Sequence, residues 1–401
     1  MFRVSNNFAV SLLRWSEFFF TFMLVLPIIF VLYSGKGITI NEFFLIHAIY
    51  LTTVFLFQLP FGYISDIFSR RKVMLFGVIA YFMAYVVLFF SYGFYQVMLV
   101  EILIGLAVAT FGGTRESYAY DLLKRLKREK EFLREWGSIN VYGQAAAFIA
   151  TIIGGFAFGF FGNTIVAING AIVFMAIICV YMLPELSEVK RKVAKKNPFQ
   201  DIASIIKMII KHPQLKWFML FPAFFGSFTL IMMWILQPTM LAASVPVILF
   251  GIFVGINQFS RVIFAKYAYK LEEVFGVKNL LYAGVGGIVL SIFAVLIALG
   301  AGADNMWLVY IMCVIIAIVP ATQKLMQLMF NSLMHHKIKS TERATVLSTS
   351  MTLGALFAAA TMIMMNLLLG EFSIAATMFV VLAMFMLILY PLHKILNMER
   401  Y

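Results

Sequence analysis

Ionisable side chains interrupt the apolar runs of this sequence at few places, and they are the first candidates for proton or solute binding. One apolar run carries Glu101, Gly105, Val108, Gly112 and Arg115. Their spacing alternates between four and three residues, which places all five on one face of a helix. At membrane depth an ionisable group costs about 2.5–3.5 kcal/mol on insertion scales, so each one requires a partner or a function.

Glu101 and Arg115 are expected at opposite ends of this face, Glu101 in the outer half and Arg115 in the inner half. Glu116 and Asp121 follow at the inner end. Surroundings of low dielectric constant disfavour an ionised carboxylate, whereas a nearby cation opposes this effect. A carboxyl group balanced in this way takes up a proton in one conformation and releases it in another. The alternative is a structural carboxylate close to the outer surface, neutralised by water or lipid headgroups.

The first apolar run contains a second charged pair, Arg14 and Glu17, three residues apart. This spacing allows the two side chains to pair on one helix face. In the alternative interpretation, Arg14 extends to the membrane surface along its own apolar stem.

The composition indicates that the chain lies in a bilayer. Of its 401 residues 63% are hydrophobic and 12% are charged, whereas a soluble domain has roughly 45–50% and about 25%. The net charge of +13 is typical of the Lys and Arg excess in cytoplasmic loops, so we expect no nucleic acid partner. The sequence contains no phosphate-binding loop, and its two cysteines have neither disulfide nor metal spacing. We therefore expect no enzyme, no metal and no cofactor.

Twelve segments have the length and composition of membrane-spanning helices, which require about 20 mostly apolar residues. The sequence lacks the alternation over about 10 residues that is typical of membrane β-barrels. It therefore predicts an all-α membrane protein. The predicted helices cover residues 8–33, 42–64, 73–91, 95–117, 136–161, 164–184, 214–240, 244–268, 278–300, 304–331, 343–369 and 372–392.

The distribution of cations predicts the orientation of these helices. On one side the loops contain Lys36 and no other Lys or Arg, and the remaining cations lie at or near the opposite side. An excess of Lys and Arg marks the cytoplasmic side. We expect both termini on that side, in the cytoplasmic (inner) membrane.

The longest polar interruption, 185–213, divides the predicted helices into two groups of six. We expect an N-terminal bundle at 1–184, a cytoplasmic linker at 185–213 and a C-terminal bundle at 214–401. Apolar residues on one face of 199–210 predict an amphipathic helix on the anionic inner leaflet.

The loop after the second predicted helix resembles the signature of the major facilitator superfamily of secondary transporters. The family pattern is Gly-x3-Asp-(Arg/Lys)-x-Gly-(Arg/Lys)2, and this chain has Gly62, Asp66, Arg70 and Arg71 at four of its positions. It departs from the pattern at two others. The stretches "TRESYAYDLLKRLKREKEF" and "STERATVLS" also resemble prokaryotic, efflux-like members. The resemblance implies two pseudo-symmetric six-helix bundles that work by alternating access, and we expect a monomer.

The resemblance also implies that this loop is a cytoplasmic latch between the bundles. Asp66 would lie at the N-terminal end of the helix 343–369, where a carboxylate is favoured by about 0.3–1 kcal/mol. Arg70 would reach Asp121, and Gly62 would allow two helices to approach closely. In the alternative interpretation the cations only anchor the loop in the cytoplasm.

Two other family motifs are incomplete in this chain. The fourth helix usually carries Arg-x2-Gln-Gly, and here Glu101-x2-Ile104-Gly105 stands in its place. The antiporter motif of the fifth helix ends in Gly-Pro-x2-Gly-Gly, of which this chain keeps Gly154 and Gly155. Three functions therefore stay open: an exporter of drugs or metabolites, an importer of an organic acid or a metal–siderophore complex, and a non-transporting receptor or lipid-handling scaffold.

The resemblance implies that the first, fourth, seventh and tenth helices line a central cavity. We expect partners there of three kinds, a small organic solute, protons and membrane lipid. Amides inside membranes often only connect helices, at about 0.6 kcal/mol each, so part of the candidate set is structural. The candidates for coupling and solute contact are Arg14, Glu17, Glu101, Arg115, Glu116, Gln144, Trp234, Gln237, Asn257, Arg261, Gln323, Gln327 and Asn331.

Overall fold

The computed structural model describes residues 6–186, 216–337, 340–387 and 392–393. Within these ranges the chain forms α-helices joined by short 3-10 turns and loops, with no strand. The predicted all-α class is confirmed. The predicted amphipathic helix of the linker lies outside the described residues.

The chain divides into two compact units. Unit 1 comprises Met1–Ile38 and Ile49–Pro198, and unit 2 comprises Thr39–Ala48 and Phe199–Tyr401. The start of the third helix therefore packs with unit 2. The helices up to the linker are α1 (Asn6–Thr21), α2 (Ile29–Ser34), α3 (Ile40–Ile67), α4 (Arg70–Phe90), α5 (Phe94–Arg125), α6 (Phe132–Phe161) and α7 (Thr164–Met182). Those after it are α9 (Lys216–Ala242), α10 (Phe250–Ala301), α11 (Met306–Lys337), α12 (Ser340–Glu371) and α13 (Ile374–Met386).

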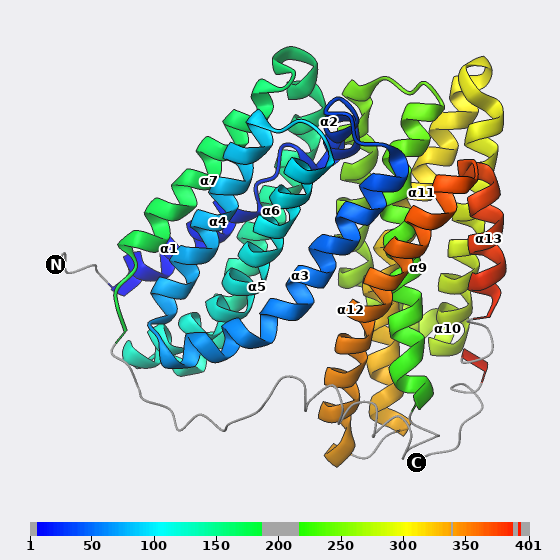
Figure 1. The fold of residues 1–401 in the computed structure, drawn as a ribbon. Coiled ribbons are helices and arrows are strands. Elements are labelled where there is room, and N and C mark those ends of the chain that lie inside the picture. Colours follow the sequence, from blue (N-terminus) through cyan, green and yellow to red (C-terminus); the bar gives the residue numbers. More distant parts are fainter. Residues whose placement is uncertain (1–5, 187–215, 338–339, 388–391, 394–401) are drawn as a thin grey trace. The chain divides into compact units, whose positions relative to one another are not determined.

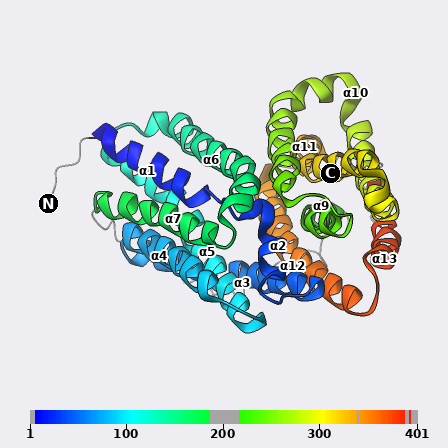
Figure 2. The ribbon, with the colours of Figure 1, turned by 90° about the horizontal axis from the view of Figure 1, so that it is seen from above.

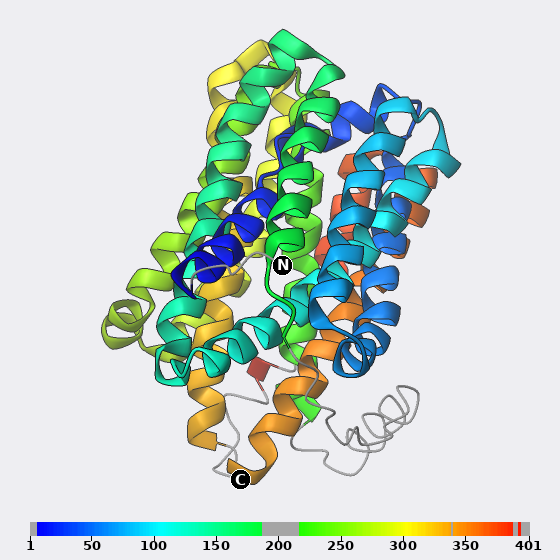
Figure 3. The same cartoon turned by 90° about the vertical axis from the view of Figure 1, so that its left-hand side faces the viewer.

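Nine stretches of the described residues are long and apolar enough to cross a membrane. One of them, Val247–Phe330, includes both α10 and α11. Figure 2 and Figure 3 show that α10 itself bends. Gly276 lies inside α10 with a φ of +72°, a conformation that glycine adopts without steric cost. The number of twelve spans stays a prediction.

The first predicted span, 8–33, matches the candidate membrane span Phe8–Ser34, but it is not one continuous helix. The structure interrupts it between Thr21 and Ile29, and Figure 1 shows α1 and α2 as separate segments. Pro27 lies in this interval, where a 3-10 turn replaces the α-helix. Proline has no backbone N–H and disturbs the preceding turn of a helix, which favours an interruption here.

Asn169 of α7 satisfies the backbone of this interruption. The backbone N–H of Leu24 donates to Asn169 Oδ1 over 2.6 Å, and Asn169 Nδ2 donates to the carbonyl of Phe22 over 3.2 Å. Asn169 is fully buried. In lipid an unpaired backbone group costs several kcal/mol, so this one side chain makes the interruption tolerable.

Glycines of α6 allow α1 and the interruption to approach closely. A Cβ atom on Gly154 would collide with the carbonyl oxygen of Leu24, and a Cβ atom on Gly143 would lie 2.7 Å from Glu17 Oε1. Small residues at helix interfaces are the usual means of close approach in membranes. Gly154, one of the two glycines that remain from the antiporter motif, therefore has a packing role.

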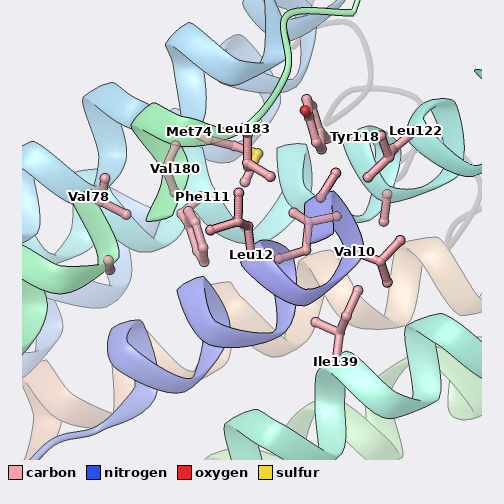
Figure 4. Packing of buried hydrophobic residues seen from close by; sticks show 14 of the residues in the cluster. Val10, Leu12, Met74, Val78, Phe111, Tyr118, Leu122, Ile139, Val180 and Leu183 are labelled. Carbon is pink, nitrogen blue, oxygen red and sulfur yellow. The ribbon is translucent and has the colours of Figure 1, made fainter. Parts of the chain in front are cut away.

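A buried apolar cluster holds unit 1 together beside these contacts. Figure 4 shows Val10 and Leu12 of α1 close to Phe111 of α5, Ile139 of α6 and Val180 of α7. The helices of unit 1 thus converge on α1, which packs against both α6 and α7. This arrangement brings the charged residues of α1 next to those of α5 and α6.

Candidate functional site

Glu101 lies in a closed, uncharged environment in unit 1. It is 5% exposed, and its Oε1 accepts a hydrogen bond of 2.6 Å from the hydroxyl of Tyr33, which is fully buried on α2. Glu101 is thus buried and hydrogen-bonded to a neutral group. Among the residues that the structure describes, no cation forms an ion pair with it. In this conformation Glu101 is closed to water rather than open at the outer surface.

Three more tyrosines surround Glu101. Tyr50, Tyr81 and Tyr85 are close enough to interact with it electrostatically, and the hydroxyls of Tyr81 and Tyr85 are 3.2 Å apart. Tyr81 and Tyr85 belong to α4 and are buried. The site therefore offers Glu101 neutral hydroxyl groups instead of a counter-charge.

The charged residues of α1 have partners on other helices. Glu17 forms an ion pair with Arg115 of α5, and Arg14 forms one with Glu135 of α6. The expected pairing of Arg14 with Glu17 is wrong, because helix packing presents a different partner to each of them. Arg128 adds contacts of 2.9 Å to Glu135 and 2.7 Å to Glu131.

Arg115 also lies against two aromatic rings. Its guanidinium carbon is 5.0 Å from the ring centroid of Trp136 and 5.5 Å from that of Phe111. The side chains of Arg115 and Glu17 are 11% and 7% exposed. Arg115 is thus neutralised and enclosed by α1, α5 and α6.

Glu135, Arg128 and Glu131 are absent from the candidates predicted from the sequence, and Glu135 is the one that pairs with α1. It falls one position before the predicted helix 136–161, and the structure starts α6 at Phe132. A usable signal was present, because Glu135, Ile139 and Gly143 follow each other at steps of four residues. That spacing places Glu135 on the face that Gly143 turns toward α1.

The residues of the signature loop make contacts within unit 1. Arg70 donates to the carboxylate of Asp121 and, over 2.7 Å, to the carbonyl of Ser117. Arg71 donates to the carbonyl of Tyr181 and lies 5.3 Å from the centroid of that ring. These cations hold the start of α4 against α5 and α7.

The other latch candidates make fewer contacts. A Cβ atom on Gly62 would meet no atom within 4 Å in the part of the chain that the structure describes. The side chains of Asp66 and Asn331 lie outside the described residues. Glu116 and Gln144 are exposed. The function of this loop as a latch stays a prediction.

The candidates of unit 2 fall into two groups, and the first group consists of Asn257, Gln237, Trp234 and Arg261. Asn257 of α10 is buried and donates to the carbonyl of Ala317 of α11 over 2.8 Å, which is a structural contact. Gln237 is buried, Trp234 packs against the His47 ring with centroids 4.0 Å apart, and Arg261 is exposed.

Gln323 and Gln327 form the second group, because both line a cavity within unit 2. The cavity has a volume of about 290 Å³ and lies between α9, α11 and α12. Its apolar wall includes Phe221, Phe225 and Phe330. Such a combination of aromatic rings and few polar groups is typical of small-molecule sites.

Residues 12–362 match the model of the Major Facilitator Superfamily. The chain belongs to this superfamily. The resemblance inferred from the sequence is confirmed, and the protein is a multi-pass membrane protein with the fold of a secondary transporter. No curated protein matches the chain.

Solved structures of other superfamily transporters share this fold. A mutant of the nucleoside transporter NupG aligns over 98% of this chain and 100% of its own, with a TM-score of 0.76 and 12% identity. A second NupG structure gives a TM-score of 0.73 at the same identity and coverage. A bacterial homolog of the human lysosomal transporter Spinster, in an inward-facing conformation, aligns over 91% of this chain and 82% of its own, with a TM-score of 0.64 and 13% identity. At such identities the similarity concerns the fold.

Within the superfamily, two departures of this chain now have a structural context. The usual cation of the fourth helix is replaced by Glu101, which is buried against the hydroxyl of Tyr33. Gly154, one of the two glycines that remain from the antiporter motif, accommodates the carbonyl of Leu24 at the interruption of the first helix. Glu101 thus lies against α2, and Gly154 lies against the chain between α1 and α2.

Proposed function

We propose that this chain is a proton-coupled antiporter that exports a small organic solute, a drug or a metabolite, by alternating access. In this proposal Glu101 carries the proton. The observation that supports it is the environment of Glu101, which is 5% exposed and has a tyrosine hydroxyl, not a cation, as its hydrogen-bond donor.

The contrast with the other buried carboxylates explains this choice. Glu17 and Glu135 face arginines, and an opposite charge favours the ionised form of a carboxylate. Glu101 has no such stabilisation, so a small change in hydration decides whether it is charged. A proton from the outer side converts the carboxylate to a neutral acid, and exposure to the inner side releases that proton.

Through Tyr33, the protonation of Glu101 affects the contact between α5 and α2. Its hydroxyl donates to the carboxylate of Glu101, and it belongs to the short helix α2, which is separated from α1 by the interruption. A hydrogen bond to a charged acceptor is stronger than one to a neutral acceptor. Protonation of Glu101 therefore weakens the contact between α5 and α2.

The test is transport by the reconstituted protein at different pH values. Proteoliposomes with an imposed pH gradient are assayed with ethidium, uridine and citrate, which represent a cationic drug, a neutral metabolite and an organic acid. Glu101→Gln mimics the protonated form at nearly constant volume. It should keep solute exchange and lose the dependence on pH, whereas Glu129→Gln, at an exposed position of unit 1, should leave the pH profile unchanged.

Other outcomes of this assay favour the other functions. Accumulation of a solute in the direction of the proton gradient would indicate an importer. The absence of transport for every solute class would favour a receptor or lipid-handling scaffold. An unchanged pH profile in Glu101→Gln would remove Glu101 from the mechanism.

A further inference from the structure

The cavity between α9, α11 and α12 has an aromatic wall. Phe221 and Phe225 stack with ring centroids 6.0 Å apart, and Phe221 and Phe330 stack at 6.1 Å. All three rings are buried. Met326 completes this side and packs against Gly284 of α10, where a Cβ atom would collide with it. This wall is therefore aromatic and apolar, and Met326 packs it against α10.

The lining of the cavity also carries two amides, on the same face of α11 as Met326 and Phe330. Gln323 and Gln327 are four residues apart on α11, both are exposed, and both line the cavity. Gln323 has no hydrogen-bond partner among the described residues. Gln327 Oε1 accepts from Lys324 Nζ over 3.3 Å, which leaves its amide nitrogen as a donor. The two amides supply hydrogen-bonding groups to an otherwise largely apolar lining, so they favour a solute with hydrogen-bonding atoms along one edge.

The lining of the cavity contains no charged side chain among the residues that the structure describes. An ion bound there would lose part of its hydration without gaining a counter-charge from the lining itself. Lys324, the ionisable neighbour, is exposed and lies outside the lining. The lining therefore favours an uncharged ligand, and a volume of about 290 Å³ accommodates one or two rings.

We propose that this cavity binds an uncharged solute with one aromatic face and one polar edge, such as a carboxamide or lactam. The aromatic face lies against Phe221, Phe225 and Phe330, and the carbonyl at the polar edge accepts from Gln323 and Gln327. The proposal rests on the function as a transporter and specifies the class of its substrate.

The experiment compares two probes of the same shape and different charge, nicotinamide and nicotinate. Binding to the full chain in detergent micelles is measured by titration calorimetry at pH 7, without a proton gradient. Nicotinamide should bind at least tenfold more tightly than nicotinate. Gln323→Leu should weaken nicotinamide binding at least tenfold, whereas Gln58→Leu, at an exposed amide of unit 1, should not.

A second pair of variants tests the position of the ligand. A Cβ atom on Gly226 would lie 3.2 Å from Gln323 Nε2, the end of a flexible side chain. Gly226→Ala should therefore fold and weaken binding, and Gly226→Leu should abolish it. Thermal melting of each variant shows whether it has folded.

Three results would overturn the proposal. They are equal or tighter binding of nicotinate, no binding of nicotinamide by the unsubstituted chain, and unchanged nicotinamide binding in the folded Gly226 and Gln323 variants. Binding without a gradient does not depend on Glu101. A failure here with pH-dependent transport intact refutes only this inference, and binding without any transport refutes the proposed function.

Discussion

Glu17 pairs with Arg115 of another helix and not with Arg14, three residues before it, and a double-mutant cycle can measure the difference. Glu17→Gln leaves the guanidinium of Arg115 enclosed without its carboxylate. The two side chains are only 7% and 11% exposed, so the loss is that of a buried ion pair.

The magnitude follows from this burial. Removal of one partner from a buried ion pair costs about 3–5 kcal/mol. Arg115 keeps its position over the ring of Trp136, a contact worth about 0.5–2 kcal/mol. We therefore expect a loss of about 3 kcal/mol for Glu17→Gln. Replacing Arg115 by Met in the same chain removes the unpaired charge, so the coupling energy between these two positions should be about 2–3 kcal/mol.

The cycle of Glu17 with Arg14 is the matched control. Arg14 has its own partner, Glu135, so its coupling to Glu17 should stay below about 0.5 kcal/mol, the upper end for an oppositely charged pair three residues apart on a helix. The assay is reversible unfolding in mixed detergent micelles, followed by tryptophan fluorescence. A coupling with Arg14 that equals or exceeds the coupling with Arg115 would refute the pairing across helices.

Three further predictions concern the interruption of the first helix and the orientation. Asn169→Ala leaves two buried backbone groups without a partner and should cost about 2–4 kcal/mol of unfolding free energy in micelles; an equal loss in Asn163→Ala, at an exposed position, would contradict this. Gly154→Leu places a side chain against the backbone of the interruption and should prevent folding, seen as aggregation in size-exclusion chromatography; a monodisperse variant would disprove the close contact. A cysteine at Gly302 should react with a membrane-impermeant reagent added outside the cell, and one at Ser187 should not. The reverse pattern would invert the predicted orientation.

The sequence by itself determined the class of this protein. The need for about 20 apolar residues per span is a local property of each segment, so composition and run length predict an all-α membrane protein. The signature around Gly62 and Arg70 is equally local. It was sufficient to identify the superfamily, which the match over residues 12–362 confirms.

The sequence also placed Glu101 on a helix face but did not predict its partner. Tyr33 lies 68 positions earlier, beyond the reach of any periodic pattern. The same holds for the interruption of the first helix. An apolar run from 8 to 33 indicates a continuous helix, whereas the backbone at Phe22 and Leu24 is satisfied by Asn169 on a distant segment.

The tertiary structure decided which charges neutralise each other. Their spacing of three residues allows Arg14 and Glu17 to pair with each other. In the folded protein Glu17 pairs with Arg115 instead, and Arg14 pairs with Glu135 of α6, whose glycines allow α6 to approach α1 closely. Local sequence patterns indicate whether a segment is exposed to lipid or to water. The pairing of buried polar groups depends on which helix faces come together, and this is settled only when the whole set of helices packs.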